Sequence, residues 1–325
     1  MKRTIFPRAA ALLLIVSSSM GTALAAPSYT VQNVQFPTDP TFTQLLGINN
    51  AGTIAGFHGA VTSQGFTLTQ PNTFTSQNFP GSAMSMVTAI NGAGNTAGIY
   101  QDAGGTTHGY TDIGGTFKTV DQPGTVFNQA LGISATTTVG YSALDKAGQV
   151  GQSAYRQSGG VFTNINALLP ATNQNSQAVG INNAGNVVGF YLPTATTSIG
   201  FLDIGGAIST IDPLGSTFTQ ALGISNTGEI VGFYTDATGV QHGYTDIGGI
   251  FASFDPAGSV NTTINGVNDL GQLVGFFTDA NDDVIGFVAT PTPVPEPATF
   301  ALLATGLLGL MGVRSRRRAS SPLRM

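Results

Sequence analysis

The sequence predicts an all-β fold for the body of this 325-residue chain. Three observations lead to this prediction: an internal repeat, a pattern of four short strands within each repeat, and the lack of a sustained 3.6-residue apolar period between Pro27 and Thr290. Apolar residues make up 41% of the chain, which is enough to bury a sizeable core. Helices should therefore be scarce in this region.

The repeat occurs six times, at steps of 42 to 48 residues. Its first element, typified by GINNAGNVVGFY, begins at Gly47, Ala89, Gly132, Gly180, Gly223 and Gly266. A second element, such as HGYTDIGG, follows it, and a third, such as IFASFDPAG, closes the unit. Runs of Ile, Val, Phe, Tyr and Thr alternate with Asn-Gly, Asp-Gly, Gly-Gly and Pro-Gly turn sequences at roughly ten-residue spacing. This pattern is typical of a four-stranded antiparallel meander.

A four-stranded unit of about 43 residues has the size of one propeller blade. The sixth unit stops at Gly286-Phe287-Val288-Ala289 and lacks a closing strand, whereas the chain begins with YTVQNVQFPTDP, which aligns with closing strands elsewhere. An N-terminal strand that completes the last blade would remove the exposed sheet edge. We therefore predict a six-bladed β-propeller over residues 26–290, with an open β-solenoid as the alternative.

The first 25 residues have the composition of a secretory signal peptide. Basic residues precede a short apolar run, and the segment ends in small residues that include Ala23 and Ala25. Cleavage by signal peptidase is predicted after Ala25. The alternative is an uncleaved membrane anchor, although the apolar run is shorter than the ~20 residues that span a bilayer.

The C-terminal end divides into three parts. A Pro-rich linker covers residues 291–297, an apolar anchor helix is predicted over 298–313, and a basic cytoplasmic tail follows over 314–325. The tail contains Arg314, Arg316, Arg317 and Arg318. An ordinary C-terminal anchor behind a Pro-rich linker would explain these features without further processing.

The motif Val294-Pro295-Glu296-Pro297, followed by a short Gly/Leu/Ala helix and an Arg cluster, resembles the PEP-CTERM sorting signal of Gram-negative bacteria. The resemblance implies processing by an exosortase-type membrane enzyme. The chain would be anchored transiently in the inner membrane and would end at the cell surface or in the extracellular matrix. Proteins of this kind tend to come from bacteria that produce exopolysaccharide.

Charge and cysteine content exclude several functions. Once both ends are removed, three Lys or Arg residues face 16 Asp or Glu residues, a net charge of about −13, which argues against nucleic-acid binding. The sequence contains no Cys, so disulfide scaffolds, thiolate metal sites and thiol catalysis are excluded.

The repeat wording is similar to the extracellular HAF-type repeat family, a resemblance that implies an extracellular repeat fold and no particular chemistry. His108-Gly109-Tyr110 and His242-Gly243-Tyr244 keep the histidine of that family. The other four units depart from it, with Gln64, Ser153, Ile199 and Ile285 in its place.

No catalytic constellation is evident, and we predict that the chain is not an enzyme. The three histidines fall in different units, so they should not share a metal. The repeated aspartates Asp112, Asp203 and Asp246, and likewise Asp121, Asp212 and Asp255, are interpreted as turn formers.

A loop near the end of the sixth unit is rich in oxygen ligands. It contains Asp279, Asn281, Asp282 and Asp283, which we interpret as an ordinary turn or a weak calcium site. No other cofactor is predicted.

The sequence as a whole predicts an exported structural or interaction module associated with exopolysaccharide, the biofilm matrix or other surface proteins. Gln44, Gln129, Gln177 and Gln220 occupy the same place in four units, where they either form a polar ring or solvate an outward strand face. The alternative function is a polysaccharide hydrolase or lyase, whose site should lie in the least regular unit, from Tyr141 to Pro170, with Lys146 and Arg156.

Overall fold

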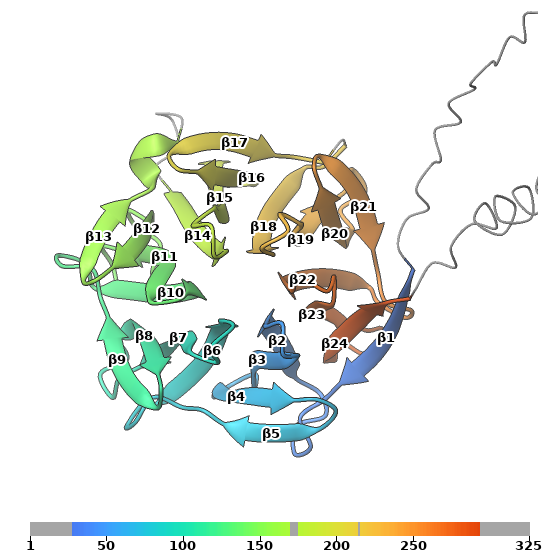
Figure 1. The fold of residues 1–325 in the computed structure, drawn as a ribbon, viewed down its shortest axis with the longest axis horizontal. Coiled ribbons are helices and arrows are strands. Elements are labelled where there is room, and N and C mark those ends of the chain that lie inside the picture. Colours follow the sequence, from blue (N-terminus) through green and yellow to red (C-terminus); the bar gives the residue numbers. More distant parts are fainter. Residues whose placement is uncertain (1–27, 170–174, 214, 293–325) are drawn as a thin grey trace, which may run out of the picture.

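The computed structural model describes residues 28–169, 175–213 and 215–292. These residues form six four-stranded antiparallel sheets arranged around a central axis, as Figure 1 shows. The prediction of a six-bladed β-propeller is confirmed, and the open solenoid is wrong because the sheets close into a ring. Regular helix in the described residues is limited to one 3₁₀ turn, η1, at Asn166–Leu168.

The strands follow the predicted four per repeat. Blade 1 consists of β2 (Thr43–Ile48), β3 (Thr53–His58), β4 (Gln64–Thr69) and β5 (Thr73–Ser76), and blade 2 of β6 (Met84–Ile90), β7 (Thr96–Gln101), β8 (Thr107–Ile113) and β9 (Thr116–Val120). Blade 3 consists of β10 (Phe127–Ser134), β11 (Thr137–Ala143), β12 (Ser153–Ser158) and β13 (Val161–Asn164). Blade 4 consists of β14 (Asn175–Ile181), β15 (Val187–Thr194), β16 (Thr197–Ile204) and β17 (Ala207–Ile211), and blade 5 of β18 (Phe218–Ile224), β19 (Ile230–Thr235), β20 (Gln241–Ile247) and β21 (Ile250–Phe254).

Blade 6 joins the two ends of the body. It contains β22 (Asn261–Val267), β23 (Leu273–Thr278) and β24 (Val284–Pro291), and its outer strand is the N-terminal β1 (Tyr29–Val34). The pairing runs from Tyr29 opposite Pro291 to Val34 opposite Gly286. The predicted closing role of the N-terminal strand is confirmed, and the last strand extends to Pro291, one residue beyond the predicted boundary.

The first turn of a unit forms because one asparagine side chain caps it. In blade 1 the Oδ1 atom of Asn49 accepts hydrogen bonds from the backbone N–H groups of Ala51 and Thr53, at 3.1 and 3.0 Å. Gly52 supplies the positive φ of +78° that the turn requires. Asn91, Asn182 and Asn268 make the same pair of contacts in blades 2, 4 and 6.

The core lies between neighbouring blades. One cluster joins Leu45, Ile54 and Phe66 of blade 1 to Val274 and Val288 of blade 6. Contacts of this kind bury the faces of the sheets that a single blade cannot cover alone.

The innermost strands approach one another closely at the repeat glycine. A Cβ atom added at Gly223 would lie 2.7 Å from the backbone oxygen of Asn265 and 3.1 Å from the Cα atom of Gly266, which belongs to blade 6. Gly132, Gly180 and Gly266 are similarly close to the next blade, and Ala89 holds this place in blade 2. These residues lie within strands, so their role is close packing and differs from the turn role that we assigned to the glycines from the sequence.

The described residues contain no helix that is both long and apolar enough to cross a membrane. The signal peptide with Ala23 and Ala25, the PEP motif, the anchor helix predicted over 298–313 and the Arg cluster all lie outside the described residues.

Candidate functional site

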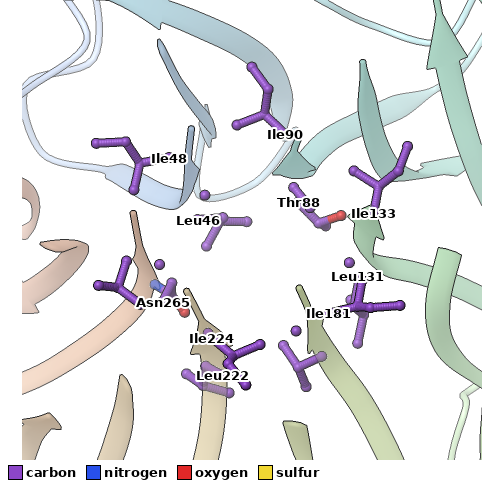
Figure 2. A pocket seen from close by; sticks show the side chains of 18 residues that line it. Leu46, Ile48, Thr88, Ile90, Leu131, Ile133, Ile181, Leu222, Ile224 and Asn265 are labelled. Atoms are coloured by element: carbon purple, nitrogen blue, oxygen red, sulfur yellow. The ribbon is translucent and has the colours of Figure 1, made fainter. Parts of the chain in front are cut away.

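The innermost strand of each blade directs side chains into a central channel. A β-bulge precedes the repeat glycine in all six blades, for example between Leu45 and Gly47. Figure 2 shows the bulge residues, such as Leu46 and Leu131, and the residues after the glycine, such as Ile48 and Ile133, around one cavity. The repeat therefore builds the channel in layers, with one residue per blade in each layer.

The middle of the channel is an apolar throat with a volume of about 180 Å³. Its side chains come from Leu46, Thr88, Leu131, Val179, Leu222, Asn265, Ile48, Ile90, Ile133, Ile181, Ile224 and Val267. The two polar residues are occupied by the protein itself: the Thr88 hydroxyl lies 2.7 Å from the Ala130 carbonyl oxygen, and Asn265 Nδ2 donates to the Leu45 carbonyl at 3.1 Å. A polar ligand would lose its hydration here without gaining partners, so the throat is a poor site for one.

One mouth of the channel, which we call the glutamine mouth, is a hollow of about 650 Å³. Gln44, Gln129, Gln177 and Gln220 all line it, which confirms that the four glutamines gather on one surface. Thr235, Gln241, Asn261, Thr263 and Thr278 add further hydrogen-bonding groups, and Phe190, Phe233 and Phe276 add aromatic walls. Every described lining residue of this mouth is uncharged at pH 7.

The ring glutamines differ in how firmly they are held. Gln177 Nε2 lies 3.4 Å from Gln152 Oε1, and Gln241 Nε2 donates to Thr263 Oγ1 at 2.8 Å. Within the described part of the chain, the amides of Gln44, Gln129 and Gln220 have no protein hydrogen-bond partner, although all three side chains are half-buried. An amide offers two donors and an acceptor, so these three side chains are available to a ligand.

The opposite mouth, the asparagine mouth, is smaller, at about 100 Å³, and is tied into the fold. Asn49, Asn91, Asn182 and Asn268 each donate from Nδ2 to a backbone carbonyl of the next blade, at 2.9 to 3.2 Å. Asp269 accepts hydrogen bonds from the side chains of Asn50 and Asn226, which flank it in the neighbouring blades. These bonds hold the ring together and leave few polar groups of the asparagine mouth open.

Two histidines are each held between two aspartates near the rim of the glutamine mouth. His242 Nδ1 lies 2.7 Å from Asp255 Oδ2, and its Nε2 lies 3.6 Å from Asp236. His108 repeats the arrangement, with Asp121 at 2.7 Å and Asp102 at 3.4 Å. Because blades 2 and 5 lie on opposite sides of the ring, the two histidines are far from each other, as predicted.

The histidine pairs correct our interpretation of Asp121 and Asp255 as turn formers. Both bind a histidine 13 residues earlier in the chain. Asp203 and Asp246 do cap turns, by accepting from the N–H groups of Gly206 and Gly249. The signal was present in the sequence, because an aspartate six residues before the histidine and another 13 after it recur in the two units that contain His-Gly-Tyr.

His242 makes stability depend on pH. The hydrogen bond from Asp255, followed by the charges of the two aspartates, raises the pKa of His242 above its usual value, and partial burial opposes this. A raised pKa in the folded state gives stability that is complete below the unfolded-state pKa of about 6.5 and is lost as the pH rises through the folded-state pKa. The pair is near the surface, so we expect at most about 1 kcal/mol.

We expect His242→Gln to lower the unfolding temperature at pH 5.5 and to have a much smaller effect at pH 8.5. Thermal unfolding of both proteins across this range measures the difference. A difference that does not change with pH would contradict the assignment of this stability to the His242 charge.

The loop proposed as a calcium site uses its first carboxylate within the turn. Asp279 Oδ1 accepts from the backbone N–H groups of Asn281 and Asp283, at 2.8 and 3.0 Å, and Asp282 adopts a φ of +65°. The described residues contain no group of three or more His, Cys, Asp or Glu side chains placed to hold a metal ion. Calcium binding at Asp279, Asn281, Asp282 and Asp283 stays a prediction.

The least regular unit does not gather a catalytic group within its described residues. Arg156 donates to the Gly185 carbonyl at 2.7 Å and lies 3.7 Å from Asp203 Oδ2, so it links blades 3 and 4. Lys146 lies in the separate loop between β11 and β12. The irregularity instead accommodates η1, beside which Ile165 and Leu169 are buried in the core.

Comparisons with known proteins support the export signal and the fold. Residues 293–318 match the PEP-CTERM protein-sorting motif. This motif implies export, a transient stay in the membrane and processing by an exosortase. A search of curated proteins gives no match to the sequence.

Two solved structures with a similar fold are a putative TolB from Agrobacterium tumefaciens and an arginine-substituted mutant of AofleA from Arthrobotrys oligospora. The first is 12% identical, with a TM-score of 0.55 over 83% of this chain and 100% of that chain. The second is 9% identical, with a TM-score of 0.50 over 83% of this chain and 91% of that chain. At these identities the likeness concerns the fold alone, so what is established for this chain is a six-bladed propeller that carries a PEP-CTERM sorting motif.

Proposed function

We propose that the exported propeller is a non-catalytic binding module of the cell surface or matrix, and that its glutamine mouth binds a neutral exopolysaccharide. The observation that carries this proposal is the lining of the mouth, where free glutamine amides surround a hollow with phenylalanine walls. Amides pair with sugar hydroxyls as donor and acceptor, and the C–H faces of a sugar ring pack against the electron-rich face of an aromatic ring.

The charge distribution supports a neutral ligand. The described lining of the mouth is uncharged, whereas carboxylates such as Asp102, Asp236 and Asp255 lie farther out on the same face. A polyanionic polysaccharide would be repelled by these groups, and the repulsion would be strongest at low salt. A neutral chain reaches the mouth without this cost.

We expect the double substitution Gln177→Ala and Gln220→Ala to weaken saturable binding of a neutral exopolysaccharide about tenfold, since each lost hydrogen bond is worth ~0.5–1.5 kcal/mol. Isothermal titration of the purified protein with size-fractionated polysaccharide measures the affinity. Gln32→Ala, which removes an exposed amide on β1 far from the mouth, is the matched control.

Equal affinities for the double variant and the control would contradict the proposed site. Repeating the titration with EDTA tests the calcium prediction at the Asp279 loop. Release of reducing ends or unsaturated sugars during the titration would overturn the non-catalytic part of the proposal and favour the hydrolase or lyase.

A further inference from the structure

Both described ends of the body lie on the same face of the disc, which we call the asparagine face because the asparagine mouth is at its centre. The Thr292 N–H donates to the Ser28 carbonyl at 2.8 Å. Pro291 packs beside Gly271, in the same turn as Asn268 of the asparagine mouth. The 33 residues after Thr292, which include the sorting motif, therefore begin on this face.

The two faces differ strongly in charge. The opposite face, the glutamine face, carries the carboxylates of Asp39, Asp102, Asp121, Asp145, Asp212, Asp236, Asp255, Asp279, Asp282 and Asp283. On the asparagine face, Asp203, Asp246 and Glu229 are buried, with 3%, 6% and 9% of their surface exposed. The other two carboxylates described there, Asp112 and Asp269, are hydrogen-bonded to Gln77 and to Asn50 and Asn226.

The asparagine face also carries exposed aliphatic side chains at its turns. Ile247 and Ile250 flank the tip of the last hairpin of blade 5 and are 54% and 76% exposed, and Leu270, in the turn beside Pro291, is 66% exposed. Ile204 and Val161 occupy matching tips in blades 4 and 3. The glutamine face has exposed aliphatic residues too, such as Val61 and Leu144, but these share their face with the ten carboxylates.

The exit of the chain lies between these aliphatic groups. Tyr29, opposite Pro291 at the start of β1, packs edge-on against Phe254 of blade 5 at 5.2 Å. The blade 5 hairpin with Ile247 and Ile250 therefore adjoins one side of the exit, and the turn with Leu270 adjoins the other.

We propose that, while the C-terminal segment is still in the membrane, the asparagine face lies against the phospholipid surface with Ile247, Ile250 and Leu270 among the headgroups. The tether holds this face close to the bilayer, and aliphatic side chains enter the interface favourably. An anionic leaflet repels the acidic glutamine face, so this orientation also keeps the carboxylates farthest from the lipid. The inference depends on the membrane-anchored stage and is independent of polysaccharide binding.

The absence of cysteine allows a direct test with one introduced label. The chain from Ala26 to Met325 is prepared as Ile250→Cys and, as the matched control on the glutamine face, as Val61→Cys, which replaces a valine that is 97% exposed. Each is labelled with an environment-sensitive nitrobenzoxadiazole probe and reconstituted into vesicles of phosphatidylethanolamine and phosphatidylglycerol. Fluorescence and quenching by spin-labelled lipid are measured on the protein that floats with the vesicles.

We expect the probe at position 250 to gain at least about twofold in fluorescence and to be quenched by spin-labelled lipid, because a label at the interface leaves water. The probe at position 61 should show neither effect. Adding Ile247→Asp to the Ile250→Cys protein should remove most of the gain. No change at position 250, an equal change at both positions or an unaltered gain with Ile247→Asp would each overturn the proposal.

Discussion

Deleting β1, Tyr29–Val34, is expected to lower the free energy of unfolding by at least about 3 kcal/mol and to make the protein associate. Val34 is 5% exposed, and burying one valine is worth ~1.5–3 kcal/mol, to which each lost ladder hydrogen bond adds about 1 kcal/mol. For a body of this size the loss corresponds to at least about 6 °C in unfolding temperature. The deletion also exposes the edge of β24, which is a template for pairing with another chain.

Thermal unfolding and light scattering after size-exclusion chromatography measure the two effects. Thr30→Ala, which alters an exposed side chain of the same strand, should leave both unchanged. If the deletion aggregates during expression, a synthetic peptide of residues 28–34 added during refolding should restore the monomer. A stable monomer without β1 or the peptide would refute the closing role of this strand.

Gly223→Val is expected to destabilise the ring by about 3 kcal/mol, at the upper end of what overpacking costs. The added Cβ would meet backbone atoms of blade 6 at 2.7 and 3.1 Å, and backbone atoms cannot move aside as a flexible side chain can. The cost falls on the contact between blades, so the whole ring should unfold at a lower temperature in one transition.

Gly92→Val is the matched control for Gly223→Val. Gly92 lines the asparagine mouth, a Cβ atom there has no neighbour within 4 Å, and its φ is not positive. Chemical denaturation of both variants should show a large loss for position 223 and little change for position 92. Similar losses at both positions would mean that β-branching, and not the approach of the blades, sets the cost.

The fold was predictable because each level of the sequence pointed to the same structure. Turn residues such as Asn49 and Gly52 recur with the period of the blades, and the unmatched ends of the body complement each other. The packing role of Gly223 was not predictable from a single repeat, because glycine is equally suited to turns and to close contacts, and only the assembled ring shows which neighbour it meets.

The candidate site was only partly predictable. The common position of Gln44 and Gln220 placed them on one surface, because residues at the same position in each blade form a ring. The aromatic walls were not predicted, since Phe190 and Phe276 come from second strands whose side chains reach the mouth only after the sheets twist around the axis. The pairs of His108 and His242 join two loops of one blade, a contact that strand patterns do not encode.

The position of β24 has a mechanical consequence. A cell-surface protein held through Thr292 and pulled by flowing liquid would carry the load along β24, which is bonded to β23 on one side and to β1 on the other. Ladder hydrogen bonds lie across the strand, so a force along the strand loads both ladders in shear and shares the strain among many bonds at once. Closing the ring with the N-terminal strand thus also reinforces the strand that bears the tension.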